Sequence, residues 1–252
     1  MPRSTPPSPP SRPPAKRAPL LAQILVGVLF VLSGACGLAY EVVWTRYLGL
    51  FLGNTVLLHT AALGAFMGGM ALGSLLAGRF ADRLPRPLRA YGWLELGVAA
   101  YGALFPLLSV VGRGLVAAAA EPFPPGTTAL LVVRVLLAAT LLLPPTLLMG
   151  MTFPLLTAHL DRSAGAGAGG ANWLYFANCA GAVVGTLITG LTLIPNIGMR
   201  ATVLGVASLN AVIALAAIVL GYSTLPSPQK VEEAVQEGRT VPGSEKWVLA
   251  AI

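Results

Sequence analysis

Six apolar runs of about 20 residues or more recur along this chain, and they limit what it can fold into. An apolar stretch of about 20 residues matches a helix that crosses a bilayer core about 30 Å thick. Charged residues make up only 10% of the chain, against about 25% in ordinary soluble domains, so too little polar surface exists to cover a large soluble core. The pattern predicts an all-α polytopic membrane protein with six transmembrane helices, at residues 20–40, 55–78, 90–111, 127–156, 173–194 and 201–222.

The basic residues indicate how these helices are oriented. An N-terminus in the cytoplasm places twelve of the 16 lysines and arginines on the cytoplasmic side, and such an excess is typical of cytoplasmic loops. The net charge of +7 comes from clusters between apolar runs rather than from one basic face, which argues against a nucleic-acid partner. The predicted surroundings are therefore a lipid bilayer.

The two ends of the chain differ from the apolar middle. Residues 1–19 are basic and rich in proline and serine, which predicts a disordered cytoplasmic tail. After the transmembrane domain of residues 20–222, residues 223–246 form a polar linker, and residues 247–252 begin another apolar run too short to cross a bilayer. We interpret the last segment as the start of a further span; the alternative is a complete six-helix protein with an apolar end.

Ionisable residues inside the apolar runs are the first functional candidates, because such residues usually face a bundle interior and pair with one another. Glu41 and Arg46 lie in the stretch SGACGLAYEVVWTRYLGLFLG (residues 33–53), whose residues 42–52 either extend the first helix or lie along the interface. We expect Arg46 to reach the membrane surface and Glu41 to turn toward Arg134; the alternative for Arg134 is that it also extends to the membrane surface. Glu95 is expected to face the interior or the arginine cluster that follows the second run.

Small residues at four-residue spacing predict close helix packing. They occur in the second and fifth runs, at Gly64, Gly68, Gly69, Gly73, Gly181 and Gly185. Tyr175 and Asn178 on the fifth run are expected to hydrogen-bond across helices.

Sequence patterns of enzymes and metal proteins are weak here. GAGAGG (residues 165–170) fits G-x-G-x-x-G, but no strand precedes it, so it reads as a linker. His59 and His159 are too far apart in the sequence, and too poorly accompanied by carboxylates or thiols, to suggest a metal site. We predict no catalytic residue, no metal and no cofactor for this chain.

The loop after the second run, GSLLAGRFADRLPRPLR (residues 73–89), resembles the signature loop between helices two and three of the major facilitator superfamily. The matching residues are Gly78, Asp82, Arg83 and Arg86, while Pro85 stands where that family has glycine. The resemblance implies a gating role for Asp82 and Arg83. The alternative is an arginine cluster that only sets topology.

Four motifs in order resemble the membrane region of bacterial fused facilitator and spermidine-synthase proteins: the stretch at residues 33–53, GAFMGGMALGSLLAGRFADR, LPPTLLMGMTFPLL, and NWLYFANCAGAVVGTLITGLTLIPNIGMRATVL. The resemblance implies one six-helix half of a facilitator bundle in the bacterial inner membrane, completed by a second half or by a second copy in a homodimer.

The resemblance leaves three functions open. The first is a transporter-like module for a small cationic, polyamine-like solute. The second is a membrane platform for a spermidine-synthase-like aminopropyltransferase, and the third is a structural membrane protein. The chain lacks the glycine-rich loop and paired aspartates of such a synthase, so catalysis by this chain alone is not expected.

Overall fold

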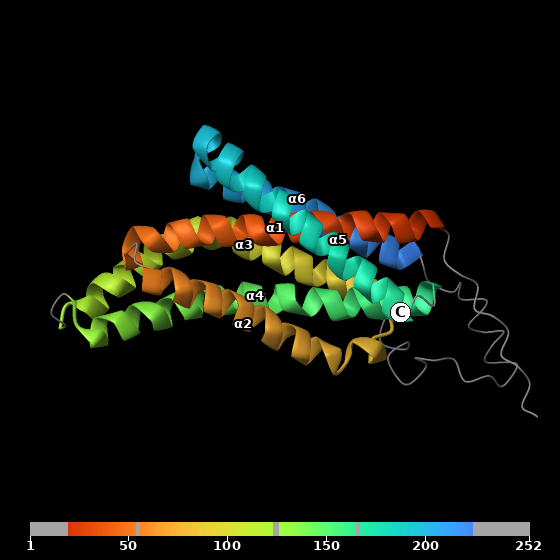
Figure 1. Cartoon of the computed structure of the whole chain (residues 1–252), viewed down its shortest axis with the longest axis horizontal. Helices are drawn as coiled ribbons and strands as arrows, with labels where there is room; N and C mark the ends of the chain where they lie inside the picture. Colours follow the sequence, from red (N-terminus) through yellow and green to blue (C-terminus); the bar gives the residue numbers. More distant parts are fainter. Residues whose placement is uncertain (1–19, 54–55, 123–125, 165–166, 224–252) are drawn as a thin grey trace, which may run out of the picture.

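The protein is all-helical in a computed structural model that describes residues 20–53, 56–122, 126–164 and 167–223. The predicted all-α class is confirmed. The predicted tail at residues 1–19 and the linker and apolar end beyond residue 223 lie outside the described residues. The elements are α1 (Leu20–Leu52), α2 (Val56–Gly78), the 3-10 turn η1 (Ala81–Arg83), α3 (Pro87–Ala120), α4 (Thr128–Ala164), α5 (Gly167–Ile188), the π-helical turn η2 (Thr189–Leu193) and α6 (Ile194–Ser223) (Figure 1).

Within these ranges, five helical segments are long and apolar enough to cross a membrane, where the sequence pattern predicted six spans. The difference lies at the last segment, Gly169–Tyr222, which is counted as one run of 54 residues because α5, η2 and α6 follow one another without a loop. The chain bends inside this run at Gly198, where φ is 77° and ψ is 166°. Figure 1 shows the chain turning back in this run, where the colour changes from cyan to blue.

The first helix is longer than the predicted span of residues 20–40. It continues without a break through Leu52, so residues 42–52 are a helical extension and not a separate interfacial segment. With 33 residues, α1 is about 50 Å long at 1.5 Å per residue. It therefore exceeds the thickness of a bilayer core by several turns.

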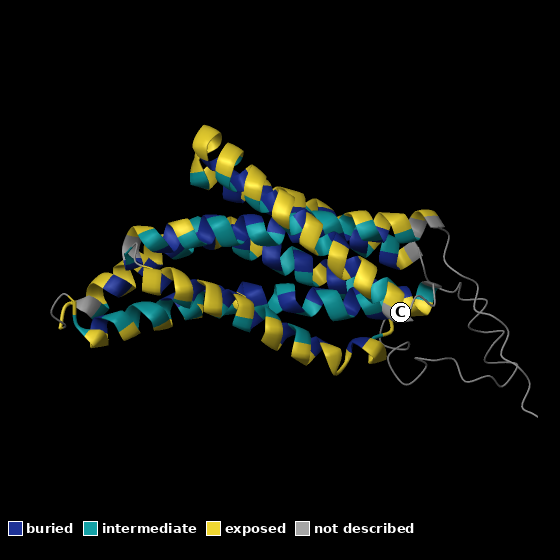
Figure 2. Ribbon diagram, viewed as in Figure 1, coloured by how far each residue is buried: buried dark blue, intermediate teal, exposed yellow. Residues whose placement is uncertain are grey.

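The helices pack in a row with α2 and α5 at its two ends. In this row α2 packs on α4, α4 on α3, α3 on α6, α6 on α1, and α1 on α5. Apolar side chains also cover the outside, including Val56 at 85% and Leu191 at 73% exposure, and Figure 2 shows exposed positions along every helix. A helix with apolar residues on its outer face as well as its packed face suits an apolar solvent.

Glycines allow close contact in two helix crossings. A Cβ atom on Gly73 of α2 would overlap the main-chain oxygen of Leu147 in α4, and one on Gly185 of α5 would overlap that of Ala35 in α1. One turn earlier, Gly181 meets the main-chain oxygen of Val31 in α1, and Gly69 meets the side-chain hydroxyl of Thr146 in α4. In both crossings the residue numbers rise together, so the paired helices are parallel. Close backbone approach of this kind is what drives helix association inside lipid.

The two crossings are copies of one another. The same interval of 112 residues separates Gly69 from Gly181 and Gly73 from Gly185, within GGMALGSLLAG (residues 68–78) and AGAVVGTLITG (residues 180–190). Exchanging α1, α2 and α3 for α4, α5 and α6 turns the α2–α4 contact into the α5–α1 contact, and the α1–α6 contact into the α4–α3 contact. The fold is therefore a repeat of a three-helix unit. Because the unit has an odd number of helices, successive copies run in opposite directions.

Candidate functional site

The most deeply buried ionisable group that the sequence singled out is Glu95, in the third turn of α3. Its side chain is only 2% exposed and lies where α3 meets α1 and α6. Ser33 of α1 donates a hydrogen bond from Oγ to Glu95 Oε1 at 2.5 Å. Asn210 of α6 donates from Nδ2 to the main-chain oxygen of Glu95 at 2.7 Å. Three helices distant in sequence thus meet at one acidic residue.

Other weakly polar groups surround this carboxyl. The Tyr91 ring, one turn earlier on α3, is fully buried, and its hydroxyl interacts with Ser33 and Glu95. The Tyr91 oxygen lies beside these two groups without a hydrogen bond to either. On α1, Cys36 is buried and its thiol faces the main-chain oxygen of Val206 in α6 at 3.9 Å. The site therefore contains hydroxyls, a thiol and amides around one carboxyl.

A group of packed aromatic rings continues from this site along α1 toward its C-terminal end. Tyr40 stacks on Trp44 at 4.9 Å between ring centroids, and Trp44 stacks on Phe105 of α3 at 5.0 Å. Tyr101 completes the group, and its hydroxyl donates to the main-chain oxygen of Leu141 in α4 at 2.7 Å. Tyr40 Oη and Trp44 Nε1 are buried without a hydrogen-bond partner. We call Ser33, Cys36, Tyr40 and Trp44 the α1 polar face, since their spacing places them on one side of the helix.

The other predicted intramembrane charges do not join this site. Glu41 is half-buried and Arg46 is exposed on α1. Across the described ranges no ion pair joins Glu41 to Arg134; the Arg134 guanidinium instead lies near Gly53, just beyond the end of α1. Of the two predicted positions for Glu95, the structure has the interior one: it faces α1 and α6, and not the arginine cluster after α2.

The two polar residues predicted on α5 have different surroundings. Asn178 donates a hydrogen bond from Nδ2 to the main-chain oxygen of Phe30 in α1 at 3.2 Å, so it lies in the α1–α5 crossing. Tyr175 is 63% exposed and contacts the Phe153 ring edge-on at 6.1 Å. No cross-helix hydrogen bond of its hydroxyl is seen in the described part of the chain.

The loop between α2 and α3 is held from α4 through its main chain. Arg162, in the last turn of α4, donates hydrogen bonds to the main-chain oxygens of Asp82 and of Leu84. The side chains of Asp82 and Arg83 are exposed, and Arg86 is the residue before α3. Arg162 is thus a loop-holding residue that the sequence pattern did not single out for this role.

Not every glycine of the predicted packing set lies in a crossing. Around Gly64 and Gly68 no atom of another helix lies within 4 Å of the place that a Cβ would take, so these two glycines make no close helix contact within the described chain. Gly69, Gly73, Gly181 and Gly185 do make such contacts. A missed glycine, Gly150 of α4, meets the main chain of Met70 in α2.

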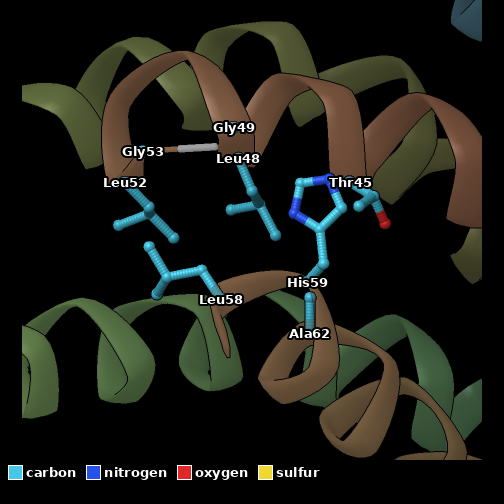
Figure 3. A pocket seen from close by; sticks show the side chains of 8 residues that line it. All are labelled: Thr45, Leu48, Gly49, Leu52, Gly53, Leu58, His59 and Ala62. Carbon is cyan, nitrogen blue, oxygen red and sulfur yellow. The ribbon is translucent and has the colours of Figure 1, made fainter. Parts of the chain in front are cut away.

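A small pocket lies between the C-terminal end of α1 and the start of α2 (Figure 3). Its empty space is about 210 Å³, part of it open to the outside. The lining is mostly apolar, with His59 and Thr45 as its polar side chains. Within the described ranges no group of three His, Cys, Asp or Glu residues is placed to hold a metal ion.

Two curated proteins of Streptomyces coelicolor resemble most of this chain. The chain is 32% identical to polyamine aminopropyltransferase 2, across 85% of its own length and 39% of that relative. It is 31% identical to polyamine aminopropyltransferase 1, across 83% of its own length and 36% of that relative. This chain is similar to polyamine aminopropyltransferases. It spans well under half the length of the curated relatives it matches.

No family model matches the chain, and no solved structure matches it. The names of the two relatives concern polyamines and aminopropyl transfer, which agrees with the spermidine-synthase side of the family resemblance. They say nothing of a facilitator.

Ser33, Tyr91 and Asn210 are site residues that the sequence pattern did not reveal. Each is a polar residue inside an apolar run, and this was the available signal. The sequence does not show that all three converge on Glu95, because they come from three different helices.

Proposed function

We propose that this chain is a polyamine-linked, transporter-like membrane module of the bacterial inner membrane, built as one six-helix half of a facilitator-type bundle and completed by a second half or a second copy. The polyamine link rests on the similarity to the two aminopropyltransferases. The two relatives are each more than twice as long as the region that matches this chain. An activity of the complete relatives therefore comes to this chain only as a proposal.

One structural observation carries the transporter assignment. Two three-helix units with opposite directions, joined by equivalent glycine crossings at Gly73 and Gly185, are the inverted repeat on which many secondary transporters are built. In such folds the solute site lies near the bilayer midplane between repeats. Here Glu95 and the α1 polar face occupy the region where the first unit meets α6 of the second.

A flux measurement tests the transporter module. The chain, co-expressed with a candidate second half or alone as a homodimer, is reconstituted into liposomes, and uptake of a radiolabelled polyamine is followed. We expect saturable uptake that empty liposomes lack. Uptake equal to that of empty liposomes under both conditions would remove the transporter assignment.

The second function is a membrane platform for an aminopropyltransferase, and the names of the two relatives favour it. In its test, a soluble aminopropyltransferase is mixed with membranes that contain the chain, the membranes are washed, and the product of aminopropyl transfer on them is measured by mass spectrometry. Product formed by enzyme retained on these membranes, without polyamine flux, supports the platform over the transporter.

The predicted orientation has its own test. A phosphatase or fluorescent reporter fused before residue 20 and another fused in the loop 121–127 should report opposite sides of the inner membrane, with the N-terminus in the cytoplasm. Equal signals from both fusions would contradict the alternating topology.

A further inference from the structure

The buried carboxyl of Glu95 accepts a hydrogen bond but has no cation beside it. Ser33 of α1 donates from Oγ to the carboxyl, Asn210 of α6 donates to the main-chain oxygen of the same residue, and the buried Tyr91 phenol of α3 lies close by without a fixed hydrogen bond. In the described part of the chain no lysine, arginine or histidine forms an ion pair with it. The basic residue two turns away, Arg89, faces elsewhere: it donates to the Tyr222 hydroxyl at 2.6 Å and lies 3.8 Å above that ring.

The titratable groups that face Glu95 are all neutral near pH 7 in their ordinary states. They are the Cys36 thiol and the Tyr40 phenol from α1 and the Tyr91 phenol from α3, while α6 contributes the uncharged Asn210. An ionised carboxylate in such surroundings has lost its hydration without gaining an opposite charge, and that is one of the costliest arrangements in a protein. A proton on the second carboxyl oxygen removes the cost of a buried charge. The neutral acid still accepts the hydrogen bond from Ser33, and its own O–H becomes a hydrogen-bond donor.

The hydroxyls beside the carboxyl offer a route for that proton. Tyr40 and Tyr91 are fully buried, and their oxygens have no fixed hydrogen-bond partner. Tyr40 lies two turns along α1 from Ser33, on the same polar face, and its ring packs against Gly102 of α3. Free hydroxyls along the α1–α3 contact are groups that accept and donate a proton when the helices shift.

We propose that Glu95 is a proton-binding site of the bundle: its carboxyl holds a proton while α1, α3 and α6 are packed together, and releases it when their contact opens. The ligand is the proton itself. The site goes beyond the polyamine proposal and does not depend on it, since it requires only the packing around Glu95. Failure of polyamine uptake leaves the proton site intact, and failure of the proton site leaves uptake to be judged separately.

Infrared spectroscopy of the purified full chain in lipid nanodiscs tests the site directly. A buried protonated acid has a C=O stretching band separate from that of a carboxylate. We expect this band at neutral pH in the wild type, its loss in Glu95→Gln, and a shift of its frequency in Ser33→Ala, where the carboxyl loses a hydrogen-bond donor. Glu41→Gln is the matched control, since Glu41 is the half-buried acid at the outer end of α1, and it should leave the band unchanged.

A second measurement uses the linkage between proton binding and folding. If the folded chain holds one more proton than the unfolded chain, its folding equilibrium constant falls up to about tenfold for each unit of rising pH. Thermal unfolding should therefore show a stability that decreases with pH in the wild type and is flatter in Glu95→Gln. The Ser33→Ala variant retains the carboxyl and keeps both tests usable where Glu95→Gln does not fold.

Two results would overturn the proposal. A wild-type spectrum with no acid band attributable to Glu95 would mean that the carboxylate is ionised as packed. Stabilisation by sodium at constant pH, lost in Glu95→Gln, would assign the site to a monovalent cation instead of a proton.

Discussion

Gly185 of α5 lies so close to the main-chain oxygen of Ala35 in α1 that a side chain at this position would overlap it. The blocking atom belongs to a helix backbone, so it moves only if the whole helix moves. We expect Gly185→Leu to lower the free energy of unfolding by about 1–3 kcal/mol, the range of core overpacking, or to prevent folding. The equivalent Gly73→Leu, against Leu147, should behave alike, and thermal unfolding in detergent measures both.

Gly68→Leu is the matched control, because Gly68 lies on the same helix as Gly73 but has open space around it. We expect little change in its unfolding temperature. Equal destabilisation by Gly68→Leu and Gly73→Leu would mean that α4 does not pack specifically on the side of α2 that carries Gly73. A concentration-dependent effect of Gly68→Leu alone would instead report a contact with a second half or a second copy.

The glycine spacing shows how far the sequence alone carries the fold. The spacing indicated that the second and fifth runs each pack closely on a neighbour, and four of the six glycines lie in the crossings of α2 with α4 and of α5 with α1. Gly64 and Gly68 have the same four-residue spacing and face outward, because a spacing defines one side of a helix without saying whether a neighbour covers that side. The sequence left two alternatives for residues 42–52, and the structure has the helical extension, because Glu41 and Arg46 lower the hydropathy there without interrupting the helix.

Gly198 forms the bend near the start of α6 with a positive φ of 77° and a ψ of 166°, in a region of backbone conformation that is essentially limited to glycine. Gly198→Ala should therefore cost about 1–3 kcal/mol of stability, or straighten the bend. Gly190→Ala, in the π turn, is the control, since that glycine has open space and no positive φ. Denaturant unfolding compares the two variants, and equal stabilities would show that the bend is not strained.

Asn210 joins α6 to α3 through the main-chain oxygen of Glu95. Asn210→Leu removes this hydrogen bond, and we expect a loss of about 1 kcal/mol, the usual value for a polar contact between helices in a membrane. Ser208→Ala is the control, because the Ser208 hydroxyl bonds only within its own helix, to Leu204, on an exposed face. Similar losses for the two variants would contradict a role of Asn210 in holding α6 on α3.

The site could be anticipated only in part, for a physical reason. A lone acid in an apolar run predicts an interior position, and Glu95 has one. Its partners are 62 residues away at Ser33 and 115 residues away at Asn210, and one serine or asparagine in an apolar helix costs little enough to be common. Only the arrangement of α1, α3 and α6 shows that they meet. The same holds for Arg162, which looked like one more cytoplasmic arginine.

Arg162 holds the loop between α2 and α3 by donating to the main-chain oxygens of Asp82 and Leu84. Arg162→Gln cannot reach both oxygens, so the short turn η1, whose own bonds are Arg83 N to Phe80 O at 2.8 Å and Leu84 N to Ala81 O at 3.3 Å, should open more often. We expect amide hydrogen exchange at residues 80–84 to rise between about threefold and tenfold, the factors for about 0.7–1.4 kcal/mol. Arg83→Gln, which changes an exposed arginine of the same loop, is the control and should change exchange little.

If the loop gates access from the cytoplasm, Arg162→Gln alters transport as well as exchange. If the arginines only set topology, exchange rises while flux stays the same. An unchanged exchange pattern in Arg162→Gln would show that the loop is held by its own turn and not by α4.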